Sequence, residues 1–209
     1  MYFPYLRGKQ FELIALREIC PLLAENRLKI SPIIEPVKLS STLRYSIDEL
    51  KKHNVNYSVI INPKVGELKT KTDKVLVFLK NLLLDYDNFQ IGIILSGKDN
   101  HSAILDSIQK HLPSNVSLSL IHNECYDNID MILNDFSSAL SVKYNVIDIG
   151  KTTRRYHRNF GKHTVVELDD YFSYQQRNSD YIDVDESDFS EEHLFYREEG
   201  YIGFSDFLT

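Results

Sequence analysis

The sequence lacks several features that mark particular protein classes. It has no tryptophan, and its two cysteines, Cys20 and Cys125, lie far apart and in no paired motif. No Cys-x-x-Cys pair or His/Cys cluster indicates structural zinc. We therefore expect two free thiols in a reducing compartment.

Long hydrophobic runs are also missing. The longest apolar stretch, residues 75–84, is interrupted by Lys80 and Asn81 and is too short to span a bilayer. The N-terminal residues lack the basic-then-apolar order of a signal peptide. We expect a cytoplasmic protein that makes no contact with a membrane.

The chain contains none of the short motifs that identify common enzyme classes. A Walker loop, a nucleophile elbow and a His-Glu-x-x-His helix are absent, and no Gly-x-Gly-x-x-Gly turn follows any predicted strand. The net charge of −6 argues against a nucleic-acid binder that depends on attraction over its whole surface. A local basic patch is compatible with this charge.

The sequence does have a regular succession of short apolar runs and helical segments. Its 209 residues, 43% of them hydrophobic and 26% charged, suffice for one good-sized domain or two small ones. The apolar runs predict seven strands, at residues 2–6, 30–37, 57–62, 89–95, 116–121, 143–149 and 163–168. The segments around them predict helices at residues 11–26 (with a kink or an end at Pro21), 43–53, 72–86, 102–112, 126–140 and around 191–198.

Strands that alternate with helices predict an α/β fold with a mainly parallel sheet. A TIM-barrel-like ring and an open doubly wound sheet both fit this pattern. We favour the barrel because nearly every predicted strand ends in polar residues and because the glycine-rich turn of nucleotide-binding open sheets is missing. A full barrel has about 250 residues, so about seven strands imply a missing strand or an open ring. We expect residues 1–170 to form this domain, and the acidic, aromatic residues 171–209 to pack on it or complete it.

Three segments resemble a known family. They are residues 1–18, the strand at 33–36, and Gly-Tyr-Ile-Gly-Phe-Ser-Asp at residues 200–206, and together they are similar to the bacterial and phage "beta protein" family. The resemblance implies a barrel-like fold and a setting in mobile or anti-phage defence systems, often beside nuclease-like genes. It supplies no catalytic residues. In the family pattern a further apolar strand follows the Gly-Phe-Ser-Asp segment, so the resemblance implies a truncated chain and an incomplete barrel.

The polar strand ends provide the candidate catalytic groups. Side chains alternate inward and outward along barrel strands, and placing Glu35 inward predicts a ring of last inward residues at the carboxyl-end mouth. The ring consists of Glu35, Asn62, Ser96, His122, Asp148 and Glu167. The candidate catalytic residues among them are Glu35, His122, Asp148 and Glu167, since carboxylates can hold a divalent metal or act as acid and base. A structural reading stays open for each, because strand ends turn polar where loops meet water, and Glu35 can be a buried carboxylate paired with Arg7.

Basic side chains supply candidate phosphate or nucleic-acid contacts. Arg154, Arg155 and Arg158 form the densest basic stretch, with Tyr156 available for stacking on a base. Arg7 and Lys38 follow predicted strands and are candidates for the same role. The alternative is that the basic stretch is a solvated loop, or that it pairs with the acidic residues 180–199 of the same chain.

Two functions follow from these observations. The first is a protein-interaction or regulatory component of a defence-type system, with a nuclease-like protein encoded nearby as its candidate partner. The second is a metal-dependent hydrolase, a phosphodiesterase or nuclease-like enzyme, that uses the strand-end ring. The two differ in a geometric prediction, since the hydrolase requires Glu35, His122 and Asp148 to meet in one cleft.

Overall fold

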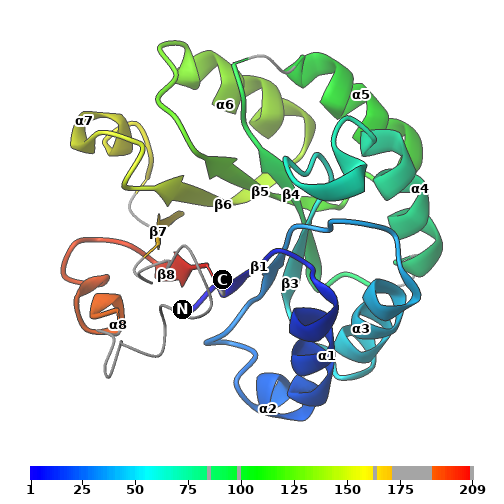
Figure 1. The fold of residues 1–209 in the computed structure, drawn as a ribbon. Coiled ribbons are helices and arrows are strands. Elements are labelled where there is room, and N and C mark those ends of the chain that lie inside the picture. Colours follow the sequence, from blue (N-terminus) through cyan, green and yellow to red (C-terminus); the bar gives the residue numbers. More distant parts are fainter. Residues whose placement is uncertain (84–85, 98–99, 162–163, 171–189, 208–209) are drawn as a thin grey trace, which may run out of the picture.

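Eight parallel strands form a single sheet in the computed structural model, which describes residues 1–83, 86–97, 100–161, 164–170 and 190–207. Their order in the sheet follows their order in the chain (Figure 1). The strands are β1 (Tyr5–Leu6), β2 (Ile33–Ile34), β3 (Tyr57–Ile60), β4 (Phe89–Ile94), β5 (Ser117–His122), β6 (Ser141–Asp148), β7 (Val165–Asp169) and β8 (Gly203–Asp206). The prediction of a TIM-barrel-like α/β fold is confirmed.

The helices lie outside the sheet, between successive strands (Figure 1). They are α1 (Gln10–Glu18), α2 (Cys20–Glu25), α3 (Ser41–Lys52), the 3₁₀ helix η1 (Gly66–Leu68), α4 (Thr72–Leu82), α5 (His101–His111), α6 (Ile129–Ala139), α7 (Arg154–His157) and α8 (Glu192–Phe195). Since all neighbouring strands are parallel, their carboxyl ends open at one mouth of the barrel.

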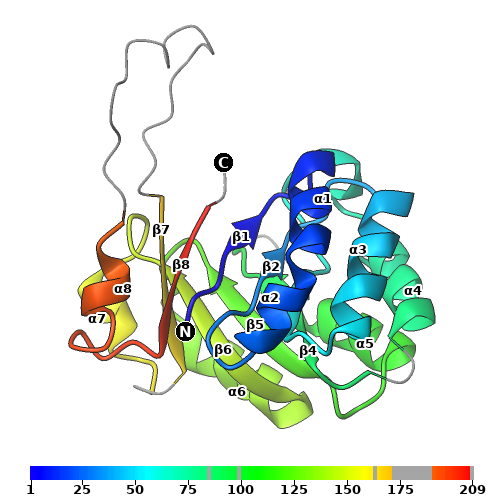
Figure 2. The ribbon, with the colours of Figure 1, turned by 90° about the horizontal axis from the view of Figure 1, so that it is seen from below.

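The barrel is nearly closed, with one seam between β8 and the N-terminal residues. Isolated bridges join Tyr2 to Phe204 and Tyr5 to Phe207, and the backbone N–H of Phe3 donates to the carbonyl of Phe204 at 2.8 Å. Figure 2 shows the N-terminus beside β8. At Gly203 a Cβ atom would overlap the carbonyl oxygen of Met1 and the ring of Phe3, so this approach requires glycine.

The count of seven strands was wrong, because β8 is the eighth. Its residues, Gly-Phe-Ser-Asp, form no apolar run, and they become a strand because β7 pairs with them along the register Val166↔Gly203 to Asp169↔Asp206. The strand that seemed to be missing therefore lies in the last part of the chain. Residues 171–189, most of the acidic segment that we expect to pack on the barrel, lie outside the described residues.

Prolines explain why β1 and β2 are shorter than predicted. Pro4 precedes β1, and Pro32 and Pro36 flank β2. A proline has no N–H to donate to a ladder, but its carbonyl still accepts, and Pro4 receives the N–H of Ile33 at 2.9 Å. Pro21 has the expected effect on the first helix, which ends at Glu18 and restarts at Cys20 with the proline in its first turn.

Two apolar layers hold the barrel together. The inner layer fills the ring with side chains such as Phe3, Ile33 and Val146, and the outer layer packs the opposite strand faces against the helices. Cys20 lies in this outer layer, Cys125 is exposed, and both are free, as expected. None of the helices in the described ranges is both long and apolar enough to cross a membrane.

Candidate functional site

Glu35 is the central polar residue at the barrel mouth. It follows β2, two residues after the inward-facing Ile33, and its side chain is fully buried. Its Oε2 atom accepts hydrogen bonds from the Tyr5 hydroxyl and from Nη1 of Arg7, each at 2.9 Å. Its Oε1 atom accepts the backbone N–H of Lys64 at 2.7 Å. One carboxylate therefore ties together β1, β2 and the loop after β3.

The contacts of Glu35 match the reading of a buried carboxylate paired with Arg7. Three donors occupy its two oxygens, and Arg7 also lies over the ring of Phe207, 4.8 Å from its centroid. Burial and the adjacent Glu35 charge hold the pKa of Tyr5 well above its usual value, so Tyr5 stays a donor. Both oxygens of Glu35 therefore have partners, which leaves little capacity for a further ligand.

Asp148 and Asn62 also lie at the mouth, each with a partner. Oδ2 of Asp148 accepts from Nζ of Lys151 at 2.5 Å. The Asn62 amide makes two hydrogen bonds with the backbone of Ile94, at 2.8 and 2.9 Å, and so continues the pairing of β3 with β4 beyond Ile60. Ser96, half-buried, follows β4. These side chains complete strand ends and loops.

His122 was predicted to face the mouth, and this was wrong. Ile121 is the inward residue of β5 and pairs with Val146, so His122 faces the helices. Its Nε2 atom lies 3.1 Å from Oδ1 of Asn145, and its Nδ1 atom lies 2.9 Å from the hydroxyl of Tyr156. Because the amide oxygen can only accept, Nε2 carries the proton and Nδ1 accepts from Tyr156. Burial lowers the pKa of His122 to about 3, so the ring is neutral.

Glu167 was also predicted to face the mouth and also points outward. Leu168 is the inward residue at this level of β7 and pairs with Asp148, which places Glu167 against α8. Burial, followed by the neighbouring Glu192 carboxylate, raises the pKa of Glu167 to about 9. The four candidate catalytic residues therefore separate into two groups. Glu35 and Asp148 lie at the mouth, whereas His122 and Glu167 lie in the outer layer.

The basic candidates are likewise distributed over the molecule. Arg154, Arg155 and Arg158 are exposed on and after α7, and Lys38 is exposed after β2. Tyr156, which we expected to be available for stacking, is only 4% exposed and packs beside His122. The structure thus gives α7 a structural role in covering β5, with its arginines facing solvent.

A lysine-lined cleft at the mouth side was not predicted from the sequence. It has a volume of about 730 Å³, lies between the first turns of α4 and α5, and includes the loop that follows β3. The lysines that line it are Lys64, Lys69, Lys71 and Lys74. These four lysines lie within eleven consecutive residues, and this local density is the feature of the sequence that could have indicated the cleft. It was missed because the site prediction considered residues at strand ends.

Two backbone features add to the cleft. The α4 helix begins after Lys71, whose side chain makes no capping hydrogen bond, and the positive end of the helix dipole lies at the cleft. Thr70, also in the wall, has a φ angle of 62°, which is strained for a β-branched residue. Residues with strained backbone angles of this kind are often found at ligand-binding sites.

Comparison with known proteins adds no identification. No family model matches the chain, and no curated protein matches it. The resemblance to the beta protein family stays a prediction, and the function has to be inferred from the geometry.

Proposed function

We propose that this barrel binds a phosphorylated small molecule in the lysine-lined cleft. The observation that carries the proposal is the convergence of Lys64, Lys69, Lys71 and Lys74 on one cleft in a chain with a net charge of −6. Among the described residues of its wall, Asp73 is the single acidic one. The positive end of α4 provides backbone donors of the kind that bind phosphate oxygens.

The size and lining of the cleft favour a small ligand. Its volume of about 730 Å³ lies in the range of small-molecule sites. Pro63, Ala103 and Ile104 supply an apolar wall beside the lysines. A nucleotide or a sugar phosphate combines an anionic group with a less polar body and so fits both parts of the site.

The geometry supports binding better than hydrolysis. Glu35 and Asp148 have charged partners and do not line the cleft, and His122 and Glu167 lie in the outer layer. The cluster that the hydrolase hypothesis requires is therefore not assembled by these residues. We retain the phosphate-binding part of that hypothesis, with the cleft lysines in place of the arginines.

Replacing two cleft lysines is expected to weaken anion binding at least tenfold. The experiment titrates the full chain with inorganic pyrophosphate and with ADP in a calorimeter, using wild type and the K71A/K74A double variant. Each lost lysine contact removes about 1 kcal/mol, and about 2 kcal/mol for the pair corresponds to roughly a thirtyfold loss of affinity. Binding should also weaken as salt is raised, because the lysines are exposed.

The matched control for this titration removes two exposed lysines that do not line the cleft. K29A/K110A changes the net charge by the same amount, and its affinity should stay within twofold of wild type. Equal losses in both double variants would show attraction by net charge alone. Wild type that binds neither probe would defeat the proposal.

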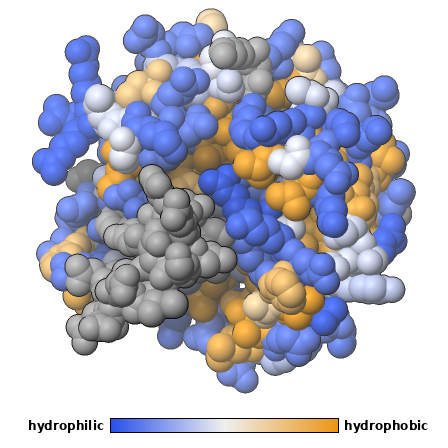
Figure 3. Space-filling model, in the orientation of Figure 1, coloured by the Kyte–Doolittle hydropathy of each residue, from blue (hydrophilic) through white to orange (hydrophobic). Residues whose placement is uncertain are grey.

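A protein-interaction role is the second candidate, and exposed apolar side chains favour it. Phe11 and Leu28 are 82% and 79% exposed, and Ile19 and Leu22 lie near them in sequence and are exposed as well. Figure 3 shows hydrophobic surface at the lower edge of this face, over α1 and α2. We propose that these residues contact a protein partner, with the defence-type setting that the resemblance implies.

Polar substitutions on α1 and α2 should disrupt any such complex. The F11S/L22S variant, expressed from the native operon, is expected to lose at least 80% of a co-purifying partner. V77S, at an exposed valine of α4, is the control that should retain it. A wild-type protein that purifies alone as a monomer would contradict the interaction role.

A further inference from the structure

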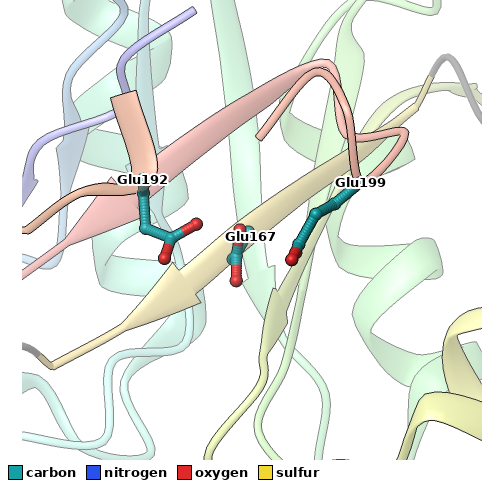
Figure 4. Close-up of side chains that lie close together, drawn as sticks. All are labelled: Glu167, Glu192 and Glu199. Carbon is teal, nitrogen blue, oxygen red and sulfur yellow. The ribbon is translucent and has the colours of Figure 1, made fainter. Parts of the chain in front are cut away.

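Three carboxylates meet between the barrel wall and α8. Glu167 comes from β7, Glu192 begins α8, and Glu199 follows that helix. One oxygen of each lies within 4.8 Å of an oxygen of the other two. Figure 4 shows the three side chains pointing toward a common space. The connection from β7 through α8 to β8 therefore brings together residues that lie 25 and 7 positions apart in the sequence.

The cluster contains buried oxygen atoms that have no partner. Glu167 is only 3% exposed, yet its Oε2 atom has no hydrogen-bond partner among the described residues, and the same holds for Oε2 of the half-buried Glu192. No lysine or arginine in the described part of the chain forms a salt bridge with any of the three. Buried carboxylates are normally paired or bound to a metal, so these atoms point to a cation as their partner.

We propose that Glu167, Glu192 and Glu199 bind a single hard divalent cation, of the class of Ca²⁺, Mn²⁺ or Mg²⁺. These ions prefer carboxylate oxygens, and the ligands are all of that kind. Oxygens on opposite sides of one Ca²⁺ are about 5 Å apart, and on Mg²⁺ about 4 Å. Oxygens that all lie within 4.8 Å of one another can therefore reach a single ion of this class.

The cation has a structural consequence at the seam of the barrel. Tyr196 of the same connection accepts a hydrogen bond from the N-terminal amine at 3.2 Å, and β8 pairs with the N-terminal residues. An ion bound by residues of both β7 and α8 therefore stabilises the position of the segment from α8 to β8, which closes the barrel. This site lies across the barrel from α4 and α5 (Figures 1 and 2), so it stands independently of the anion cleft.

The experiment uses the full chain after treatment with EDTA and exchange into metal-free buffer at pH 7.5. Titration with CaCl₂, MnCl₂ and MgCl₂ in a calorimeter should show one site for at least one of the ions. At 1 mM of that ion, the thermal midpoint should rise by at least 3 °C. A NaCl control of equal ionic strength should produce no such rise.

Two variants and a control make the assignment specific. E199Q removes an exposed ligand and should weaken binding at least tenfold, whereas E198Q, at the exposed neighbouring residue, should stay within twofold of wild type. E167Q removes an oxygen ligand from the buried side of the site and should abolish the response to the ion.

Three results would overturn the proposal. The first is the absence of both a heat of binding and a change in thermal midpoint with any of the three ions at 5 mM. The second is an equal response of E199Q and E198Q to the ion, and the third is a response to the ion that E167Q retains.

Discussion

Replacing Glu35 by glutamine is expected to lower the free energy of unfolding by about 3 kcal/mol. The amide cannot accept from Arg7, Tyr5 and the Lys64 backbone at once, since one of its two polar atoms is a donor. Breaking a buried ion pair while its partner remains costs about 3–5 kcal/mol. We expect the lower end, because the Arg7 side chain is partly exposed and can turn toward water. Urea unfolding followed by circular dichroism measures the difference.

A second glutamate provides the control for this measurement. Glu18 forms a surface salt bridge with Arg17 at 3.2 Å, and E18Q should change the free energy of unfolding by less than about 0.5 kcal/mol. In the double variant E35Q/R7M the unpaired guanidinium is gone, so part of the loss should be recovered. A loss in E35Q no larger than that in E18Q would contradict the central role of Glu35 at the mouth.

His122 is expected to make the protein less stable as the pH falls from 6.5 toward 4.5. In the unfolded chain a histidine takes up a proton below about pH 6.5. In the folded protein burial lowers the pKa of His122 to about 3, so the ring stays neutral through this range. The unfolded state therefore binds one more proton than the folded state, and stability is lost as the pH falls. The expected contribution is about 1.4 kcal/mol per pH unit, or roughly 2–3 kcal/mol over the range.

The measurement compares wild type with H122Q at several pH values. The variant has no titrating group at this position and can still bond with Asn145 or Tyr156, so its stability should fall less steeply on acidification by the amount above. The NMR signals of the His122 ring in wild type should also stay constant from pH 8 to 5. Equal slopes in the two proteins, or a wild-type ring that titrates near pH 6.5, would refute the assignment.

Local sequence pattern predicted most of the fold. The helix period and the apolar runs located seven of the eight strands and the main helices, because buried parallel strands and amphipathic helices carry their pattern within a few residues. β8 was missed because Gly203–Asp206 has no such pattern. Its strand conformation depends on β7 and on the N-terminal residues that pair with it.

The sequence predicted less well which side chains point into the barrel and which point toward the helices. Glu35 and Asp148 face the mouth as expected, but His122 and Glu167 face the helices. In a strand one residue of error reverses the face, and a polar strand end does not reveal which of its last two residues is inward. Only the register of Ile121 with Val146 and of Asp148 with Leu168 decided this.

The sequence by itself therefore determined the α/β barrel, since periodicity and strand-end polarity are local properties of the chain. The tertiary structure decided how the barrel closes, which lysines share a cleft, and that Glu167 meets Glu192 and Glu199. The physical reason is the same in each case. These contacts join residues through the packing of loops and helices on the barrel, and no short-range pattern in the sequence records that packing.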